Sequence, residues 1–314
     1  MNRLSANIAE FLSDNGFEYS LQSRCDFDII YTRTCVTRET RAILPLEIHA
    51  RTLDEARQMS TQAEMVIKTI KAESAHPIII PEDRWNRQEE MFRGRLLAHL
   101  EVFSQAYARN CEVRRIDKDT ARKFLEENHS YGDAACKFRY GLFLKRYTGH
   151  TAEKKISSCC PPEGGAGCIN AVQNIPDIGS LIAVATFSNA RKWIKDGKEI
   201  RSYEWTRYAS LPSLRVSGGM GKLLKAFIDE VHPDDIMSYA DLEWSEGNVY
   251  EALGFAEEAP KEPVCFEIDP GSWERRALRG FPSDSGTMVS CQDVNLFYMN
   301  FGSRKLRLKL TEYR

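Results

Sequence analysis

One tyrosine in the stretch SYADLEWSEGNVYEALGF, residues 238–255, has a setting in which it could donate a proton. A strand-like apolar segment leads through Asp241 into a short helix-like stretch that contains Tyr250 and ends at Gly254-Phe255. A phenol suits this task because it can hold a proton and give it to a departing group while staying uncharged at neutral pH. The alternative is a core aromatic residue whose hydroxyl is satisfied locally, and the sequence leaves both interpretations open.

A glycine-rich turn opens the helix that precedes this stretch, in the sequence SLPSLRVSGGMGKLLKAFIDEV. Gly218, Gly219 and Gly221 let the backbone come close to a ligand, and the unpaired amides of the first helical turn attract anions. A pyrophosphate would fit there, although a plain turn uses glycine in the same way. The helix itself is indicated by an apolar face at helical spacing, which consists of Met220, Leu223, Leu224, Phe227, Ile228 and Val231.

Two carboxylates in the N-terminal region could hold a metal ion. The segment CDFDIIYTRTCVTRETRAILPLEIHA puts Asp28 on one expected strand and Glu47 on the next, with His49 two residues later on the same face. Mg²⁺ can activate water where two carboxylates converge on one side of a sheet. Asp28 and Glu47 are therefore candidate metal ligands. Acidic residues on adjacent strands are also common without a metal, and that interpretation stands beside the first.

A loop rich in glycine, proline, serine and cysteine at residues 148–179 is predicted to be an insertion between two adjacent strands. Its His150, Cys159, Cys160 and Cys168 could hold zinc. Because adjacent cysteines lack the usual CxxC spacing, a loop with free thiols is favoured over a zinc site.

The composition suits a globular protein with room for two hydrophobic cores, since 42% of the 314 residues are hydrophobic and 28% are charged. The net charge of −2 excludes a globally basic nucleic-acid binder but allows a local basic groove.

No stretch approaches membrane-spanning length, and the N-terminal residues lack the features of a signal peptide. The nine cysteines, an odd number, favour reduced thiols. We therefore expect a cytoplasmic protein with no membrane partner, and no oligomeric state follows from the sequence.

Residues 1–105 predict a small α/β domain, because short apolar runs bounded by polar or proline residues alternate with apolar helical stripes. One such stripe consists of Met59, Ala63, Val66, Ile67 and Ile70. The expected elements are helices at Arg3–Asn15, Leu53–Glu73 and Asn86–Gln105 and strands at Cys25–Thr32, Ala42–His49 and Pro77–Ile80.

Residues 106–314 predict a second domain, whose element order is strand, helix, three strands, helix, strand, helix, strands. The fold class is therefore α/β (α+β). A final hairpin is expected in NLFYMNFGSRKLRLKL, with its turn at Gly302-Ser303. The other expected elements are strands at Cys111–Ile116, Phe138–Leu144, Leu181–Phe187, Tyr203–Leu211, Asp235–Leu242 and Val264–Ile268 and helices after Asp117, at Gly219–Val231 and around Tyr250.

From about Cys111 to Asp269 this order and its motifs resemble the GNAT superfamily of acyl-coenzyme A N-acyltransferases. The phosphate-binding turn of that family reads roughly (Q/R)xxGxG before a helix, and VSGGMG supplies Gly219 and Gly221 in the glycine places and Val216 in the polar place. The family's Yxx(L)GF setting is matched by NVYEALGF. The resemblance implies a mixed sheet flanked by helices, acetyl-CoA or another acyl-CoA as cofactor, and a coenzyme A thioester as partner.

The resemblance also implies roles for individual residues. Tyr250 would protonate the departing thiolate, and the strand YEWTRYASL would offer backbone groups to the pantetheine arm. His129 or Asp241 would take a proton from the acceptor amine, although His129 could equally cap its helix and Asp241 could hold a backbone turn. The residues that would bind the cofactor are Gly218, Gly219, Gly221, Lys222 and Asn248.

A narrower likeness is to the GNAT-like domains of phage and mobile-element proteins related to the Mom DNA-modification proteins. It is carried by YARNCEVRRI, FLEENHSYG, LIAVATFS and KLLKAFI together with the tyrosine stretch, and it implies a nucleobase as acceptor. Some of those proteins carry a nuclease-like domain in front, and PD-(D/E)xK nucleases hold their metal with an Asp and a Glu arranged as Asp28 and Glu47 are. His49 occupies the place of the nuclease lysine, so the N-terminal domain resembles a degenerate version that would need Mg²⁺ only if it is active.

An alternative function is a nuclease-type or nucleic-acid-binding protein whose GNAT-like domain is a recognition module for DNA or RNA. Runs of basic residues could form a phosphate-binding track, although such runs are usually solvated faces. Trp193, Trp205 and Trp244 could stack a base, although core packing is favoured for each. The basic runs are Arg84, Arg87, Arg93 and Arg95, then Arg275, Arg276 and Arg279, then Arg304, Lys305, Arg307 and Lys309.

Overall fold

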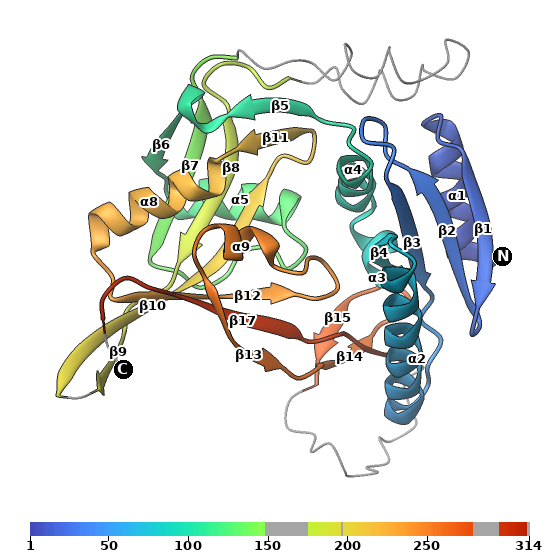
Figure 1. Cartoon of the computed structure of the whole chain (residues 1–314). Coiled ribbons are helices and arrows are strands. Elements are labelled where there is room, and N and C mark those ends of the chain that lie inside the picture. The colour runs from blue at the N-terminus through green and yellow to red at the C-terminus, as the bar shows by residue number, and fades with distance from the viewer. Residues whose placement is uncertain (148–174, 196, 279–294, 313–314) are drawn as a thin grey trace. The chain divides into compact units, whose positions relative to one another are not determined.

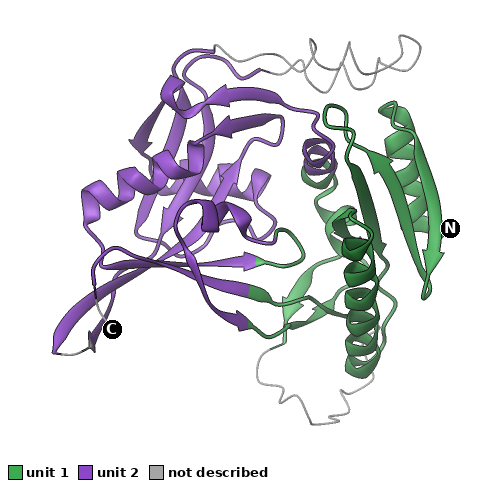
Figure 2. Cartoon of the chain, in the orientation of Figure 1, with its two compact units in different colours: residues 1–92, 241–245, 261–303 green, residues 93–240, 246–260, 304–314 purple. Residues whose placement is uncertain are grey.

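The computed structural model describes residues 1–147, 175–195, 197–278 and 295–312 (Figure 1). The chain divides into two compact units, each assembled from separate stretches (Figure 2). Unit 1 consists of residues 1–92, 241–245 and 261–303, and unit 2 consists of residues 93–240, 246–260 and 304–314. This division differs from the expected contiguous domains 1–105 and 106–314, because two late segments cluster with the N-terminal region.

Unit 1 contains a four-stranded sheet in the order β1-β2-β3-β4 and a three-stranded sheet in the order β15-β14-β16. The first three strands of the larger sheet are antiparallel, and β3 pairs in parallel with β4 after the crossover helix α2. The elements are α1 (Arg3–Asp14), β1 (Tyr19–Arg24), β2 (Phe27–Arg33), β3 (Thr40–Leu46), α2 (Leu53–Ala72), β4 (His76–Pro81), α3 (Glu82–Arg87), α4 (Glu89–His99), which continues into unit 2, β14 (Cys265–Ile268), β15 (Arg275–Ala277) and β16 (Leu296–Met299).

The apolar stripe predicted on α2 faces the core of unit 1. Ala63, Val66 and Ile70 are buried in one cluster with Ile29 and Leu44 of the four-stranded sheet. A capping box at the start of α2 satisfies its first amides. The late segment completes the same core, to which it contributes Phe266, Ile268, Leu296, Tyr298 and Phe301. The apolar surface of these late residues therefore explains why they belong to unit 1.

Unit 2 contains an eight-stranded sheet in the order β13-β17-β12-β10-β8-β7-β6, with β9 paired to β10, and a short parallel pair of β5 with β11. The elements are β5 (Ser104–Tyr107), the 3₁₀ turn η1 (Ala108–Asn110), β6 (Cys111–Arg115), α5 (Lys118–Asn128), β7 (Phe138–Leu144), β8 (Leu181–Phe187), β9 (Arg191–Lys195), β10 (Lys198–Ser210), β11 (Leu214–Ser217), α8 (Gly219–Val231), β12 (Asp235–Asp241), α9 (Asn248–Ala252), β13 (Ala256–Lys261) and β17 (Ser303–Lys309).

Helices α5 and α8 pack against opposite faces of this sheet (Figure 1). Consecutive residues of a strand point to opposite faces, and Val184 of β8 packs with α5 while its neighbours Ala183 and Ala185 pack with α8. On the α8 face the rings of Phe187 and Phe227 stack with centroids 3.9 Å apart. The sheet is thus buried on both sides.

The predicted α/β class is confirmed, with mixed sheets and flanking helices. The helix predicted at Gly219–Val231 has the bounds of α8, and the strands predicted at Phe138–Leu144 and Leu181–Phe187 have the bounds of β7 and β8. From β6 to α9, the predicted order of strands and helices is present, with β9 and β11 as additional short strands.

The predicted hairpin at Gly302-Ser303 is wrong. β16 pairs with β14 in unit 1, whereas β17 lies between β13 and β12 in the large sheet of unit 2. The Asn300 side chain accepts the backbone N–H of Val264 at 2.6 Å and that of Gly302 at 3.1 Å. A Cβ on Gly302 would come within 2.2 Å of the Lys261 carbonyl oxygen. The turn therefore packs against residues 261–264 and does not close a hairpin.

The helix predicted at 86–105 is present only in part, because α4 covers residues 89–99, α3 ends separately at Arg87, and the chain forms the strand β5 from Ser104. Several short strands were not predicted. β13 has the sequence AEEAPK and is exposed along its whole length, so it lacks the alternation of buried and exposed side chains on which strand prediction depends. β1, β5, β9 and β11 were missed as well.

Candidate active site

The strands β10 and β12 of unit 2 separate after a short parallel contact. Only Ser202, Tyr203 and Glu204 of β10 pair with β12, whereas β10 continues to Ser210 in antiparallel contact with β8. A register shift between Trp205 and Arg207 marks the point of departure. Parallel neighbours that diverge leave backbone groups of both strands available to a third partner.

Two residues lie where the strands separate. Ser238 of β12 is buried and donates its hydroxyl to the Trp205 carbonyl oxygen at 3.0 Å. The Trp205 ring is 2% exposed, and its indole N–H donates to the Arg207 carbonyl at 3.0 Å. Trp205 therefore belongs to the core, as favoured from the sequence, and does not present a face for base stacking.

Tyr250 lies on α9, next to Trp205. Its ring meets the Trp205 ring edge-on with centroids 5.8 Å apart and the Phe255 ring at 5.5 Å. Burial raises the pKa of the Tyr250 phenol, and a hydrogen bond with the Ser238 hydroxyl offsets part of that rise. Burial also raises the pKa of the nearby Tyr208 to about 12. The Tyr250 phenol is therefore protonated at neutral pH, as a proton donor must be, and it is also part of an aromatic cluster.

The glycine turn before α8 presents its backbone to solvent. Gly218 has φ of 77° and is exposed, as is Ser217 before it. The first N–H groups of α8 thus begin at an accessible end of a 13-residue helix, where the macrodipole favours an anion. This geometry suits the pyrophosphate of a nucleotide cofactor.

The other two glycines of the turn have packing reasons of their own. A Cβ on Gly219 would lie 3.2 Å from Val216 and 3.3 Å from Leu142, and one on Gly221 would lie 3.2 Å from Leu253. Both glycines let α8 pack closely against neighbouring elements. Their presence is therefore explained without a ligand. Gly218 is the residue whose conformation shapes the exposed turn at the start of α8.

Lys222 uses its ammonium group within the fold. Its Nζ donates to the carbonyl oxygens of Ala108 at 2.8 Å and Cys111 at 2.5 Å, which ties the 3₁₀ turn η1 to the start of α8. Asn248 is the first residue of α9 and is exposed.

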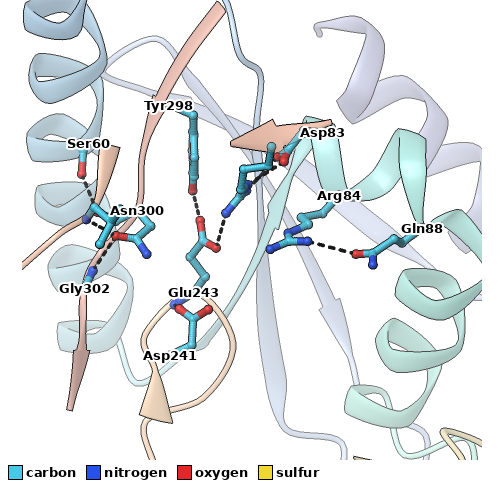
Figure 3. A network of polar contacts seen from close by, with 11 residues as sticks. Ser60, Asp83, Arg84, Gln88, Asp241, Glu243, Tyr298, Asn300 and Gly302 are labelled. Atoms are coloured by element: carbon cyan, nitrogen blue, oxygen red, sulfur yellow. Dashed lines mark hydrogen bonds and ion pairs between the residues drawn. The ribbon is translucent and has the colours of Figure 1, made fainter. Parts of the chain in front are cut away.

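His129 and Asp241 belong to different units and each holds a local turn. His129 is the C-cap residue of α5, and its Nδ1 accepts the backbone N–H of Tyr131 at 3.1 Å. Asp241 accepts the backbone N–H of Glu243 at 3.0 Å through Oδ1 (Figure 3). These are the local roles weighed for both residues from the sequence, and the fold gives no support for the two acting as a pair.

A buried ionic network in unit 1 was not anticipated. Arg275 donates to Asp83 at 2.7 and 2.8 Å and to Glu243 at 2.9 Å. Tyr298 donates its hydroxyl to Glu243 (Figure 3). Burial alone would lower the pKa of the Arg275 guanidinium, but the charges of Glu243 and Asp83 outweigh it and raise that pKa. The four residues come from four distant segments, so no local sequence signal could have indicated the network. It fixes the 241–245 segment within unit 1.

Asp28 and Glu47, the predicted metal ligands, both bind the first turn of helix α1. Asp28 accepts the Asn2 backbone N–H at 2.9 Å and the Ser23 hydroxyl at 2.9 Å, and Glu47 accepts the Leu4 backbone N–H at 3.4 Å. Across residues 1–147 and the other described ranges, no three His, Cys, Asp or Glu side chains gather in a metal-binding group. Both carboxylates instead accept N–H groups at a helix start that have no partner within the helix.

Asp28→Asn should lower the stability of unit 1 by about 1 to 2 kcal/mol, because it removes an anionic acceptor from a helix N-terminus. Burial alone would raise the pKa of Asp28, but the bonds from Asn2 and Ser23 outweigh it and lower that pKa. The stabilisation is therefore complete above the unfolded pKa of about 4 and is lost as pH falls through the lower folded value. Thermal denaturation of both proteins from pH 3 to 7 checks this.

The matched control is Glu10→Gln, on the exposed face of α1, which should change the melting temperature little. A rise in melting temperature with Mg²⁺ that Asp28→Asn abolishes would contradict this role and restore the metal site.

Arg275 and the basic run at residues 304–307 are paired with neighbouring acids. In unit 2, Arg304 pairs with Glu251 at 2.5 Å and with Glu257 at 2.6 Å, and Arg307 pairs with Asp235 at 2.5 Å. In unit 1, Arg275 is buried in the network above. A phosphate-binding track through Arg275 and the 304–307 run is therefore not supported. Arg279 and the cysteine-rich loop with His150, Cys159, Cys160 and Cys168 lie outside the described residues.

Every helix in the described ranges is too short or too polar to cross a membrane.

No protein-family model matches the chain, and no curated protein matches it. Among solved structures, the chain is similar to Eis1 from Mycobacterium abscessus, with 14% identity over 56% of this chain and 37% of Eis1 and a TM-score of 0.30. It is also similar to YncA from Salmonella typhimurium with its cofactor acetyl-CoA, with 15% identity over 65% of this chain and 96% of that one and a TM-score of 0.31.

A third similar structure is the AtaT toxin bound to the C-terminus of the antitoxin AtaR and acetyl-CoA, with 11% identity over 60% of this chain and 93% of that one and a TM-score of 0.25. At these identities and scores, the function has to be inferred from the geometry of the chain itself.

Proposed function

We propose that unit 2 is an acyl-coenzyme A-dependent N-acyltransferase. The observation that carries this proposal is the separation of β10 from β12 after three parallel residue pairs, with Tyr250 and Trp205 beside the point of separation. In the same unit, α8 begins at an exposed turn suited to a diphosphate. A cofactor with a diphosphate at one end and a reactive thioester at the other needs both features.

In this proposal each part of the site has one task. Bound acyl-coenzyme A supplies an activated acyl group as a thioester. Gly218 and the first amides of α8 hold the diphosphate of the cofactor. The backbone of β10 beyond Trp205 lies along the pantetheine arm of the cofactor. The Tyr250 hydroxyl holds the proton that a departing sulfur requires.

An amine acceptor must lose a proton before or during its attack on the acyl carbon. The family resemblance assigns that proton to His129 or Asp241. Since both are engaged in local turns, their use as a base requires a change in those hydrogen bonds when substrate binds. The narrower resemblance to DNA-modification proteins implies a nucleobase acceptor. Asp28 and Glu47 have a structural role in this proposal.

The decisive experiment adds charge at the proposed diphosphate site without disturbing the fold. Ser217→Asp places a carboxylate beside the start of α8, where it stabilises the helix by about 0.5 kcal/mol but repels a diphosphate. Calorimetric titration should show acetyl-CoA binding to the native protein and at least about tenfold weaker binding to this variant. Ser217→Asn is the neutral control of nearly the same shape and should bind normally.

Two outcomes contradict the proposal. One is an absence of binding heat with the native protein at millimolar acetyl-CoA. The other is equal acetyl-CoA affinity in Ser217→Asp and Ser217→Asn, which would move the cofactor away from α8.

A further inference from the structure

A row of polar residues crosses the α5 face of the unit 2 sheet. The strand registers place Arg139 of β7 opposite Thr186 of β8, and Thr186 opposite Arg207 of β10. Residues directly opposite each other on adjacent strands share a face. Arg139 follows Phe138 and precedes Tyr140, which both pack with α8, so the row faces the other side. Two guanidinium groups therefore flank one threonine on a single face.

The segment between α5 and β7 lies against this row and adds Asp133 and Cys136. The Arg207 Nε donates to the Gly132 carbonyl at 3.1 Å, which anchors the segment to β10. Burial raises the pKa of the Cys136 thiol, and the charges of Arg139 and Asp133 act on it with opposite signs. We call Asp133, Cys136, Arg139, Thr186 and Arg207 the α5-side cluster.

Two charged atoms of the α5-side cluster are buried without a hydrogen-bond partner. They are Asp133 Oδ1, an acceptor, and Arg139 Nε, a donor. Buried polar atoms are nearly always satisfied in folded proteins, by protein or by something bound. An acceptor and a donor left open in one cluster indicate a ligand that offers both complements.

The charges of the α5-side cluster define the ligand further. Arg207 gives its bonds to the carbonyls of Gly132 and Thr206, so its charge is not cancelled by a hydrogen-bonded carboxylate. Burial lowers the pKa of this guanidinium, and the nearby charges of Glu204 and Asp133 offset only part of that fall. Two arginines would repel a polyamine, and Asp133 would disfavour a dianionic phosphate. A ligand with one ammonium or amine group and one carboxylate offers an N–H group to Asp133 and an anion to the two arginines.

We propose that the α5-side cluster binds the acyl acceptor, and that the acceptor is a small molecule carrying both a primary amine and a carboxylate, as a free amino acid does. Asp133 Oδ1 accepts an N–H of the amine, and Arg139 and Arg207 face the carboxylate. This inference rests on the proposed function. β10 links the two sites, because Trp205, beside Tyr250, and Arg207, in the cluster, lie on either side of its register shift.

Calorimetric titration of the full chain tests the subsite without acetyl-CoA. The probes are L-alanine and L-glutamine, their C-terminal amides, spermidine and adenosine. The two amino acids should bind at least about tenfold more tightly than any probe that lacks the carboxylate. Arg139→Met should weaken their binding about tenfold, while Lys137→Met, an exposed cation two residues away on the same segment, should leave it nearly unchanged.

Equal binding of an amino acid and its amide overturns the inference, and so does full affinity in Arg139→Met. Tighter binding of adenosine than of either amino acid also overturns it, in favour of a nucleobase acceptor. The proposed function fails separately, through the acetyl-CoA titration of the same native protein. Retained acetyl-CoA binding by Arg139→Met shows that this variant is folded, and coenzyme A release on addition of L-glutamine links the two sites.

Discussion

Replacing Arg275 with methionine should destabilise unit 1 by about 3 to 5 kcal/mol, the effect expected when one partner of a buried ionic network is removed. Asp83 and Glu243 are 1% and 5% exposed at their side chains, so the variant would leave two carboxylates buried without their cation. Methionine retains most of the apolar volume that packs against Phe266 and Tyr298. The loss is therefore electrostatic, and not the result of a cavity.

Arg276→Met is the matched control. Arg276 is the next residue, and its side chain is 67% exposed. It pairs with the exposed Glu274 at 3.5 Å, so removing this surface ion pair should lower the stability by less than about 1 kcal/mol. Because the chain forms two units, stability should be read for unit 1 alone, by hydrogen exchange of peptides that cover residues 265–278. Equal protection in the two variants would show that the network contributes no more than a surface pair.

The ionic network also bears on the site in unit 2. Glu243 holds the 241–245 segment inside unit 1, and the chain resumes in unit 2 at residue 246, directly before α9 and Tyr250. A sequence alone shows Asp241, Glu243 and Tyr250 as near neighbours along one stretch. In the fold, Asp241 and Glu243 belong to unit 1 and Tyr250 belongs to unit 2. The reason is that the buried Glu243 carboxylate pairs with Arg275, which lies in unit 1.

The parts of the fold that sequence could predict are those in which local pattern and burial coincide. Helix α8 has a continuous apolar face and a glycine turn at its start, and both signals are local. β7 and β8 are short apolar runs because both faces of the large sheet are covered. These elements position Gly218 and the core around Phe227, so the proposed cofactor end of the site was predictable.

The parts that sequence could not predict depend on contacts between distant segments. Arg275 appeared as a member of a surface basic run, yet its partners lie 32 and 192 residues away. Asp28 and Glu47 were predicted to share a metal ion, but each accepts a backbone N–H group at the start of α1, which sequence analysis did not place beside them. The pairing register of β7, β8 and β10 determines which residues meet in the α5-side cluster. Arg139 and Arg207 lie on different strands, and no local sequence pattern links them.

Tyr250→Phe should lower kcat for acyl transfer by about 100-fold, because a positioned general acid contributes two orders of magnitude or more. The ring still packs on Trp205 and Phe255, and only the hydroxyl that meets Ser238 is lost. The dissociation constant for acetyl-CoA, measured by calorimetry, should therefore stay nearly unchanged. Tyr208→Phe, in the same aromatic cluster, is the control and should keep most of its kcat.

The pH dependence separates a proton donor from a packing residue. Since burial raises the pKa of the Tyr250 phenol above its ordinary value of about 10, the phenol stays protonated from pH 6 to 9. The ratio of native to Tyr250→Phe kcat should then be large and constant across that range. A ratio near one assigns Tyr250 to the core alone, and a ratio that collapses toward high pH would mean that its phenol ionises within the working range, which burial opposes.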